Sequence, residues 1–164
     1  MLNRFLISVF SLSAIVFAQI PSVAIAQNAL SLQIERSANS SSAINLTLED
    51  LDKLRQTEFT TSTIWTDEPV KFSGVSLYEL LKSLEISGKT IELIALNEYS
   101  ISIPMSELDN PLPIVATRMD DEQMSVRDKG PFWLVYNYDS DPSFQNETIY
   151  SRSIWQLNRI NLVE

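Results

Sequence analysis

Short strand-like segments, each broken off by turn residues, constrain this chain more than any other feature of its sequence. They are rich in β-branched and aromatic residues, which favour strands. The strand-like segments are residues 30–34, 57–65, 70–72, 91–96, 99–103, 114–118, 132–138 and 157–163. Helical segments are fewer and do not alternate with strands as βαβ units would. We therefore predict one α+β domain, a mixed and mostly antiparallel β-sandwich or open barrel with two or three short helices.

Two segments carry the signals of helices. A capping box of Ser76 with Glu79 precedes four leucines at helical spacing, and Gly88 is predicted to end that helix. Gly74 just before it is predicted to be a flexible corner. Thr47 is predicted to begin a shorter helix, because the acidic residues Glu49 and Asp50 would lie in its first turn. No repeat and no long linker divides the chain.

Polar turns join several of the strands. Asn97-Glu98 is predicted to connect one hairpin, and Asp120-Asp121 to form the tip of another. The serine-rich stretch 37–42 and the polar stretch 139–146 are predicted to be loops.

The first 26 residues have the parts of an export signal. Arg4 precedes an apolar run over residues 5–20, and Ala24-Ile25-Ala26 offers the small residues that a signal peptidase requires. The run is followed by Pro21 and is shorter than a bilayer span, so we predict cleavage rather than a retained anchor. Residues 27–164 would then form the mature domain, without a membrane span, in a bacterial periplasm.

The composition narrows the chemistry. The chain has 12 basic and 21 acidic residues, a net charge of −9, and loss of Arg4 with the signal would make it −10. Such acidity disfavours nucleic acid as a partner. The sequence contains no Cys and no His, which excludes serine triads, cysteine nucleophiles and ordinary zinc or haem sites. A hydrolase built on Asp and Glu is an alternative, but no paired-carboxylate spacing supports it.

Several segments, taken in order, resemble the motifs of a known family. Residues 72–81 read F-S-G-V-S-L-Y-E-L-L and residues 114–120 read I-V-A-T-R-M-D. They are followed by K-G-P-F-W-L-V at 129–135 and L-N-R-I-N-L at 157–162. Over roughly residues 45–163 the chain resembles the molybdopterin-binding domain of the sulfite oxidase-like oxidoreductases. The resemblance implies an α+β fold that encloses a molybdenum–pterin cofactor.

The chain departs from this family where the cofactor would be held. The resemblance implies a Cys thiolate on the metal and basic side chains on the pterin and its phosphate. The thiolate position falls within Thr60-Thr61-Ser62-Thr63, whose hydroxyls are poor substitutes for a soft ligand. Trp133 stands where the family has Arg, and Trp155 lies near where it has Lys. The resemblance therefore indicates a small periplasmic member that lacks the Cys ligand.

These departures lead to two hypotheses on function. We predict a non-catalytic module that binds or senses a small ligand, or that acts with a periplasmic or membrane partner protein, with no cofactor. The alternative is an active oxidoreductase that holds a molybdopterin cofactor without a protein thiolate. We assign no catalytic residue and no metal ligand.

The candidate residues of the cleft follow from the same positions. They are Thr61, Ser62, Thr63, Trp65, Arg118, Gly130, Trp133, Arg152 and Trp155. The hydroxyl residues could be a remodelled ligand loop or an ordinary strand. The tryptophans could line a pocket or fill the core. The two arginines could be part of an anion site near Gly130 or ordinary surface ion pairs, and the acidic loops are expected to be solvated rather than calcium sites.

Overall fold

Two sheets make up the part of the chain that the structure describes. The structure is a computed structural model, and it describes residues 31–35, 43–108 and 112–163. The predicted export signal and the whole serine-rich stretch 37–42 lie outside these residues. The first sheet contains β1 (Ser31–Glu35), β2 (Ala43–Thr47), β5 (Thr90–Ala95), β6 (Ser100–Pro104) and β10 (Leu157–Val163). The second contains β3 (Gln56–Thr61), β4 (Val70–Ser76), β7 (Ile114–Met119), β8 (Glu122–Gln123) and β9 (Trp133–Val135).

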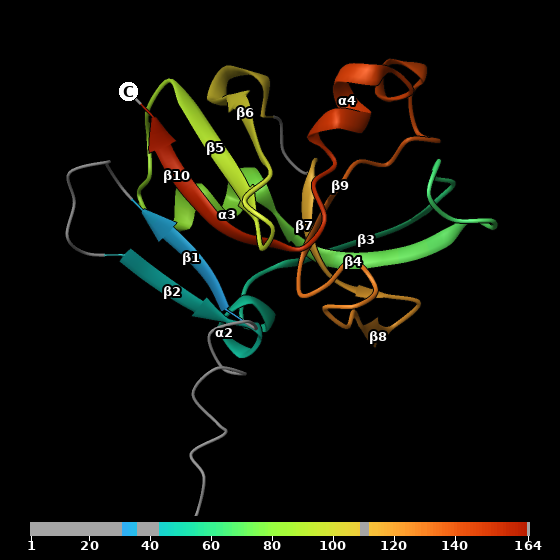
Figure 1. Ribbon diagram of the computed structural model, residues 1–164, viewed down its shortest axis with the longest axis horizontal. Coiled ribbons are helices and arrows are strands. Elements are labelled where there is room, and N and C mark those ends of the chain that lie inside the picture. Colours follow the sequence, from blue (N-terminus) through green and yellow to red (C-terminus); the bar gives the residue numbers. More distant parts are fainter. Residues whose placement is uncertain (1–30, 36–42, 109–111, 164) are drawn as a thin grey trace, which may run out of the picture.

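The order of the strands makes each sheet mostly antiparallel. The first sheet has the order β2-β1-β10-β5-β6, and only its β1–β10 pair is parallel. The second has the order β3-β4-β7-β8, with β9 also paired to β7, and all of these pairs are antiparallel. Figure 1 shows the two sheets side by side, with α4 (Glu147–Arg152) above β9. The predicted α+β class is confirmed, and the sheets form an open arrangement rather than a closed barrel.

Local capping signals account for two of the three α-helices in the described residues. Thr47 begins α2 (Leu48–Asp52), and its side chain and that of Asp50 bond reciprocally to each other's backbone N–H. Ser76 begins α3 (Leu77–Ser83) by accepting a hydrogen bond from the backbone N–H of Glu79. The predicted end of this helix at Gly88 is wrong. It ends at Ser83, because the chain turns through a left-handed conformation at Glu85 (φ 56°).

Gly74 is not the predicted flexible corner but a residue inside β4. It lies opposite Thr57 on one side and Ala116 on the other. A Cβ atom at this position would lie 2.1 Å from the carbonyl oxygen of Val115. The sequence requires glycine here because two backbones approach closely, not because the chain bends.

Two further strand predictions need correction. The strand predicted over 57–65 ends at Thr61, and the strand predicted over 132–138 is reduced to β9. The strand β2 and the helix α4 were not predicted from the sequence. Both hairpins are confirmed, and Asp120 and Asp121 adopt the left-handed values (φ 51° and 66°) that a tight two-residue turn requires.

One hydrophobic core connects both sheets and α3. Leu77, Leu80 and Leu81 of the helix are buried together with Phe72 of β4 and Leu93 of β5. Each such side chain contributes about 1.5–3 kcal/mol through burial. No helix within the described ranges is long and apolar enough to cross a bilayer.

The close approach at Gly74 gives a test of the sheet packing. We expect Gly74→Ala to lower the free energy of unfolding by about 3 kcal/mol or more, because the added methyl group meets rigid backbone. Urea unfolding followed by circular dichroism measures the loss. Gly88→Ala is the matched control, since its Cβ would meet only the movable side chain of Leu162. Equal losses in the two variants would contradict this account.

Candidate functional site

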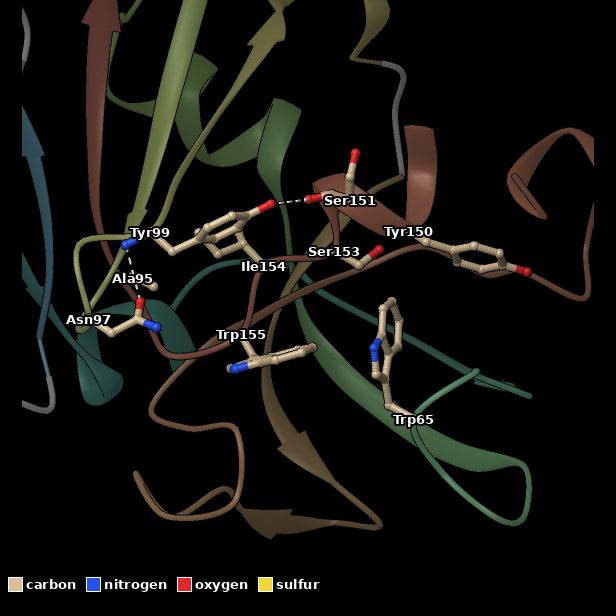
Figure 2. Close-up of a pocket in the computed structure, with 9 residues that line it drawn as sticks. All are labelled: Trp65, Ala95, Asn97, Tyr99, Tyr150, Ser151, Ser153, Ile154 and Trp155. Carbon is tan, nitrogen blue, oxygen red and sulfur yellow. Dashed lines mark hydrogen bonds between the residues drawn. The ribbon is translucent and has the colours of Figure 1, made fainter. Parts of the chain in front are cut away.

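A pocket of about 310 Å³ opens where three parts of the chain meet (Figure 2). They are the loop after β3, the β5–β6 hairpin, and the segment that runs from α4 to β10. The lining residues are Trp65, Ala95, Asn97, Tyr99, Tyr150, Ser151, Ser153, Ile154 and Trp155. None of them is charged, and four are aromatic. The volume lies at the small end of the range for ligand sites.

Aromatic rings meet at nearly right angles along the pocket wall. The ring centroids of Trp65 and Trp155 lie 5.8 Å apart with an interplanar angle of 79°. Trp65 also contacts Tyr150 at 5.9 Å and 89°. Figure 2 shows Trp155 below Tyr99, with Trp65 upright at the side. Tyr99 and Trp155 are exposed by 51% and 39%, so two large aromatic side chains stay open to solvent at this pocket.

The stretch 61–66 holds Trp65 in place. The buried Thr61 accepts a hydrogen bond from the backbone N–H of Asp139 through its Oγ1 (3.1 Å), and the Ser62 N–H donates to a carboxylate oxygen of Asp139 (2.6 Å). Thr63 Oγ1 then accepts from the backbone N–H of Trp65 (3.0 Å). The predicted hydroxyl residues therefore orient the wall of the pocket, and none of the three lines it.

Trp133 lies behind the pocket rather than in it. Its side chain is fully buried, and its indole Nε1–H donates to the carbonyl oxygen of Ser153 (3.0 Å). Its ring contacts those of Trp65 (5.6 Å) and Trp155 (6.4 Å). The structure thus brings the three tryptophans into one cluster, in which Trp65 and Trp155 face the pocket and Trp133 supports them.

The opposite wall comes from the β5–β6 hairpin. Asn97 Oδ1 accepts from the backbone N–H of Tyr99 (3.1 Å), which fixes the turn. The Tyr99 hydroxyl reaches the carbonyl oxygen of Ser151 at 3.5 Å and so bridges the hairpin to the end of α4 (Figure 2). This contact closes one side of the pocket.

A buried hydroxyl pair lies beneath the wall. The Tyr138 hydroxyl donates to Ser153 Oγ (2.6 Å), and Ser153 Oγ donates to the carbonyl oxygen of Ile149 (2.8 Å). Burial raises the pKa of Tyr138 far above its ordinary value, so this phenol stays protonated. These two hydrogen bonds have a structural role, because they hold Ser153 and so position the adjacent Ile154 and Trp155.

The candidate basic residues lie outside the pocket lining and have acidic partners. Arg118 binds Asp52 with two parallel hydrogen bonds of 2.6 and 2.7 Å. These hydrogen bonds lower the pKa of Asp52 and raise that of Arg118. Arg152 Nη1 lies 2.7 Å from Glu107 Oε2.

Gly130 lies in the loop that leads to β9. A Cβ there would meet the carbonyl oxygen of Met124 at 2.1 Å, so the residue permits a close backbone approach. In the described part of the chain, no group of three or more acidic residues is arranged to hold a metal ion.

The residues present do not fit an anionic molybdenum–pterin cofactor. Where the resemblance implies a thiolate, the chain has hydroxyl residues, and the Thr61 hydroxyl already donates to the Ser62 carbonyl oxygen (3.3 Å) and accepts from the backbone N–H of Asp139. Where the resemblance implies an Arg, the chain has the buried indole of Trp133. The two arginines among the candidates are held by acids, whereas a phosphate needs free cations.

Of the comparisons with known proteins, the one with solved structures supports the α+β fold. No family model matches the sequence, and no curated protein matches it. Among solved structures, the chain is similar to the sulfane dehydrogenase SoxCD from Paracoccus pantotrophus, with a TM-score of 0.55 and 16% sequence identity. The match covers 80% of this chain but only 37% of that chain. The likeness is therefore one of fold, and membership of the sulfite oxidase-like family stays a prediction.

Several pocket residues were missed in the sequence. Tyr99, Asn97 and Tyr150 line the pocket, but nothing near them in the sequence marks a site. An exposed tyrosine beside a hairpin turn and a helix tyrosine are common in any fold. Contacts between distant segments bring them together: Tyr99 reaches Ser151, 52 positions away, and Tyr150 contacts Trp65.

The Arg118–Asp52 pair gives a pH-dependent test. Because the folded-state pKa of Asp52 is lowered from 3.8, its contribution to stability is present above that value and is lost as the pH falls through the folded-state pKa. We expect Arg118→Gln to cost about 1 kcal/mol at neutral pH, since both side chains are partly exposed, and almost nothing in strong acid. Urea unfolding across this range measures the difference. A cost that stays constant with pH would contradict the assignment.

The hydrogen bonds between Asp139 and residues 61–62 give a test of how Trp65 is held. We expect Asp139→Ala to shift the indole N–H resonance of Trp65 and to lower the free energy of unfolding by about 1.5–3 kcal/mol, because a charge-assisted hydrogen bond to Ser62 is lost. Two-dimensional NMR and urea unfolding provide the two readouts. Asp141→Ala removes the same charge from a carboxylate that bonds Ser143 instead, and should leave the Trp65 resonance in place.

Proposed function

We propose that this chain is an exported, non-catalytic module on an oxidoreductase-like fold, and that it binds a small ligand in the aromatic pocket. The proposal rests on which residues occupy the positions where a cofactor would be held. Where the resemblance implies a thiolate and cations, the chain has hydroxyls, a buried Trp133 and a pocket with an uncharged lining. Such a site suits binding better than redox or phosphate chemistry.

The titratable groups support a binding role. Hydrogen bonds lower the pKa values of the Asp50, Asp52 and Asp141 carboxyl groups. Burial raises the pKa of Tyr136 to about 12. These shifts lead away from neutrality, whereas a general acid or base works best with a pKa near the operating pH. The chain also has no His or Cys that could take such a role.

Location and partners belong to the same proposal. The export signal over residues 1–26 supports a periplasmic location in a bacterium. A small acidic binding module there would deliver or report its ligand to another periplasmic or membrane protein. Nucleic acid is disfavoured by the net charge of −9.

An active molybdenum–pterin oxidoreductase is the second candidate. The order of the sequence motifs and the likeness of fold to a sulfane dehydrogenase favour it. It would have to hold the metal without a cysteine thiolate. It would also need cations released from their present acidic partners.

Metal content separates the two candidates. The full chain, with its signal, is expressed in a bacterium that makes the molybdenum cofactor and is purified from the periplasm. We expect well below one molybdenum atom per folded chain by mass spectrometry of the metal, because the residues that the family uses are absent. A molybdoenzyme exported by the same host serves as the loading control. Near-stoichiometric molybdenum would overturn the proposal and favour the oxidoreductase.

A further inference from the structure

The aromatic walls of the pocket meet as a corner rather than as a slot. Trp65 stands at 79° to Trp155 and at 89° to Tyr150. A flat ligand gains most between two parallel rings, where both of its faces are covered. A compact, rounded group gains most in a corner, where it touches the faces of two perpendicular rings at once. The shape of this wall therefore favours a compact group.

The surface that such a group would meet is electron-rich and uncharged. The faces of tryptophan and tyrosine rings carry negative electrostatic potential and attract cations. The carbonyl oxygen of Ser151 accepts the hydrogen bond of the Tyr99 hydroxyl, which leaves the oxygen lone pairs of Tyr99 unshared. No cationic side chain is among the lining residues, so the lining offers an anion no opposite charge.

Three basic residues outside the pocket lining have partners of their own. Arg152 is held by Glu107 at 2.7 Å, and Arg159 by Glu98 at 2.7 Å. Lys129 lies over the ring of Trp133, with its Nζ 5.5 Å from the ring centroid. The aromatic cluster thus already accepts one ammonium group on its closed side. The chain as a whole, with a net charge of −9, attracts cations from solution.

We infer that the ligand of this pocket is a compact organic cation of the quaternary-ammonium class, bound by the faces of Trp65 and Trp155 with Tyr99 across the opening. The inference rests on the proposed binding function and names its ligand class. A methylated ammonium group has no hydrogen-bond donor of its own to satisfy. An aromatic corner with few polar groups can therefore hold it without a carboxylate.

NMR titration of the purified chain tests the ligand class. Its three tryptophans give three indole N–H signals, one for each side chain of the cluster. Choline is the probe, and 3,3-dimethylbutan-1-ol is its neutral control of nearly equal shape. We expect choline to bind at least about tenfold more tightly, because only the charge distinguishes the two. The signals of Trp65 and Trp155 should move most, and that of the buried Trp133 least.

Variants locate the binding. Trp155→Leu should weaken choline binding at least about tenfold, because one of the two ring faces is removed. Tyr99→Leu, at an exposed position, removes the opposite wall and serves if the first variant does not fold. Tyr78→Leu is the matched control. Tyr78 is exposed by 38%, close to the 39% of Trp155, but lies on α3 outside this pocket, so its loss should leave choline affinity unchanged.

The outcomes distinguish this inference from the function on which it rests. Equal binding of choline and its neutral control, or tighter binding of flat indole, would overturn the cation inference and leave a small-ligand module in place. Unmoved Trp65 and Trp155 signals at high choline in folded protein would also overturn it. Molybdenum in the purified chain would overturn the proposed function by a separate measurement.

Discussion

The buried indole of Trp133 is the contact on which the rest of the site depends. It lies on β9 of one sheet, contacts Phe72 of β4 at 5.3 Å, and donates its N–H to Ser153 on the segment that leads to the other sheet. Because the ring is fully buried, its one polar group must be satisfied there. The hydrogen bond to Ser153 ties β9 to the segment that carries Trp155, and the Trp133 ring packs against both Trp65 and Trp155.

An arginine at this position would impose a different interior. A buried guanidinium needs an anionic partner and ordered donors around it, or the cost of removing it from water is prohibitive. Trp133 instead permits a dry aromatic cluster, in which rings contact one another edge to face. Among the nearby cations, Arg152 pairs with Glu107 at 2.7 Å. The described structure thus combines an aromatic interior around Trp133 with an ion-paired arginine outside it.

Local signals predicted the elements that local contacts make. Thr47 and Asp50 lie three residues apart and cap α2 as expected, and Asp120 and Asp121 are adjacent residues that adopt the left-handed conformation of a tight turn. Features that depend on contacts between distant residues could not be predicted from the sequence. The strand β3 ends at Thr61 because Asp139, 78 positions away, bonds the Thr61 hydroxyl. The helix α4 has no buried residue of its own, so it carries no hydrophobic pattern to read. In the site, Trp133 and Trp155 could be singled out because they lie where the resemblance implies cations, whereas Tyr99 could not.

The central place of β10 in its sheet has a consequence for how the chain folds. This strand lies between β1 and β5, yet it is the last strand along the described chain. The first sheet cannot assemble until residues 157–163 have been synthesised, and β1 must wait for a partner that follows it by more than a hundred positions. Contacts of such long separation form slowly. A newly made chain would therefore remain open for longer than one built from neighbouring hairpins, which suits any route that requires an extended polypeptide.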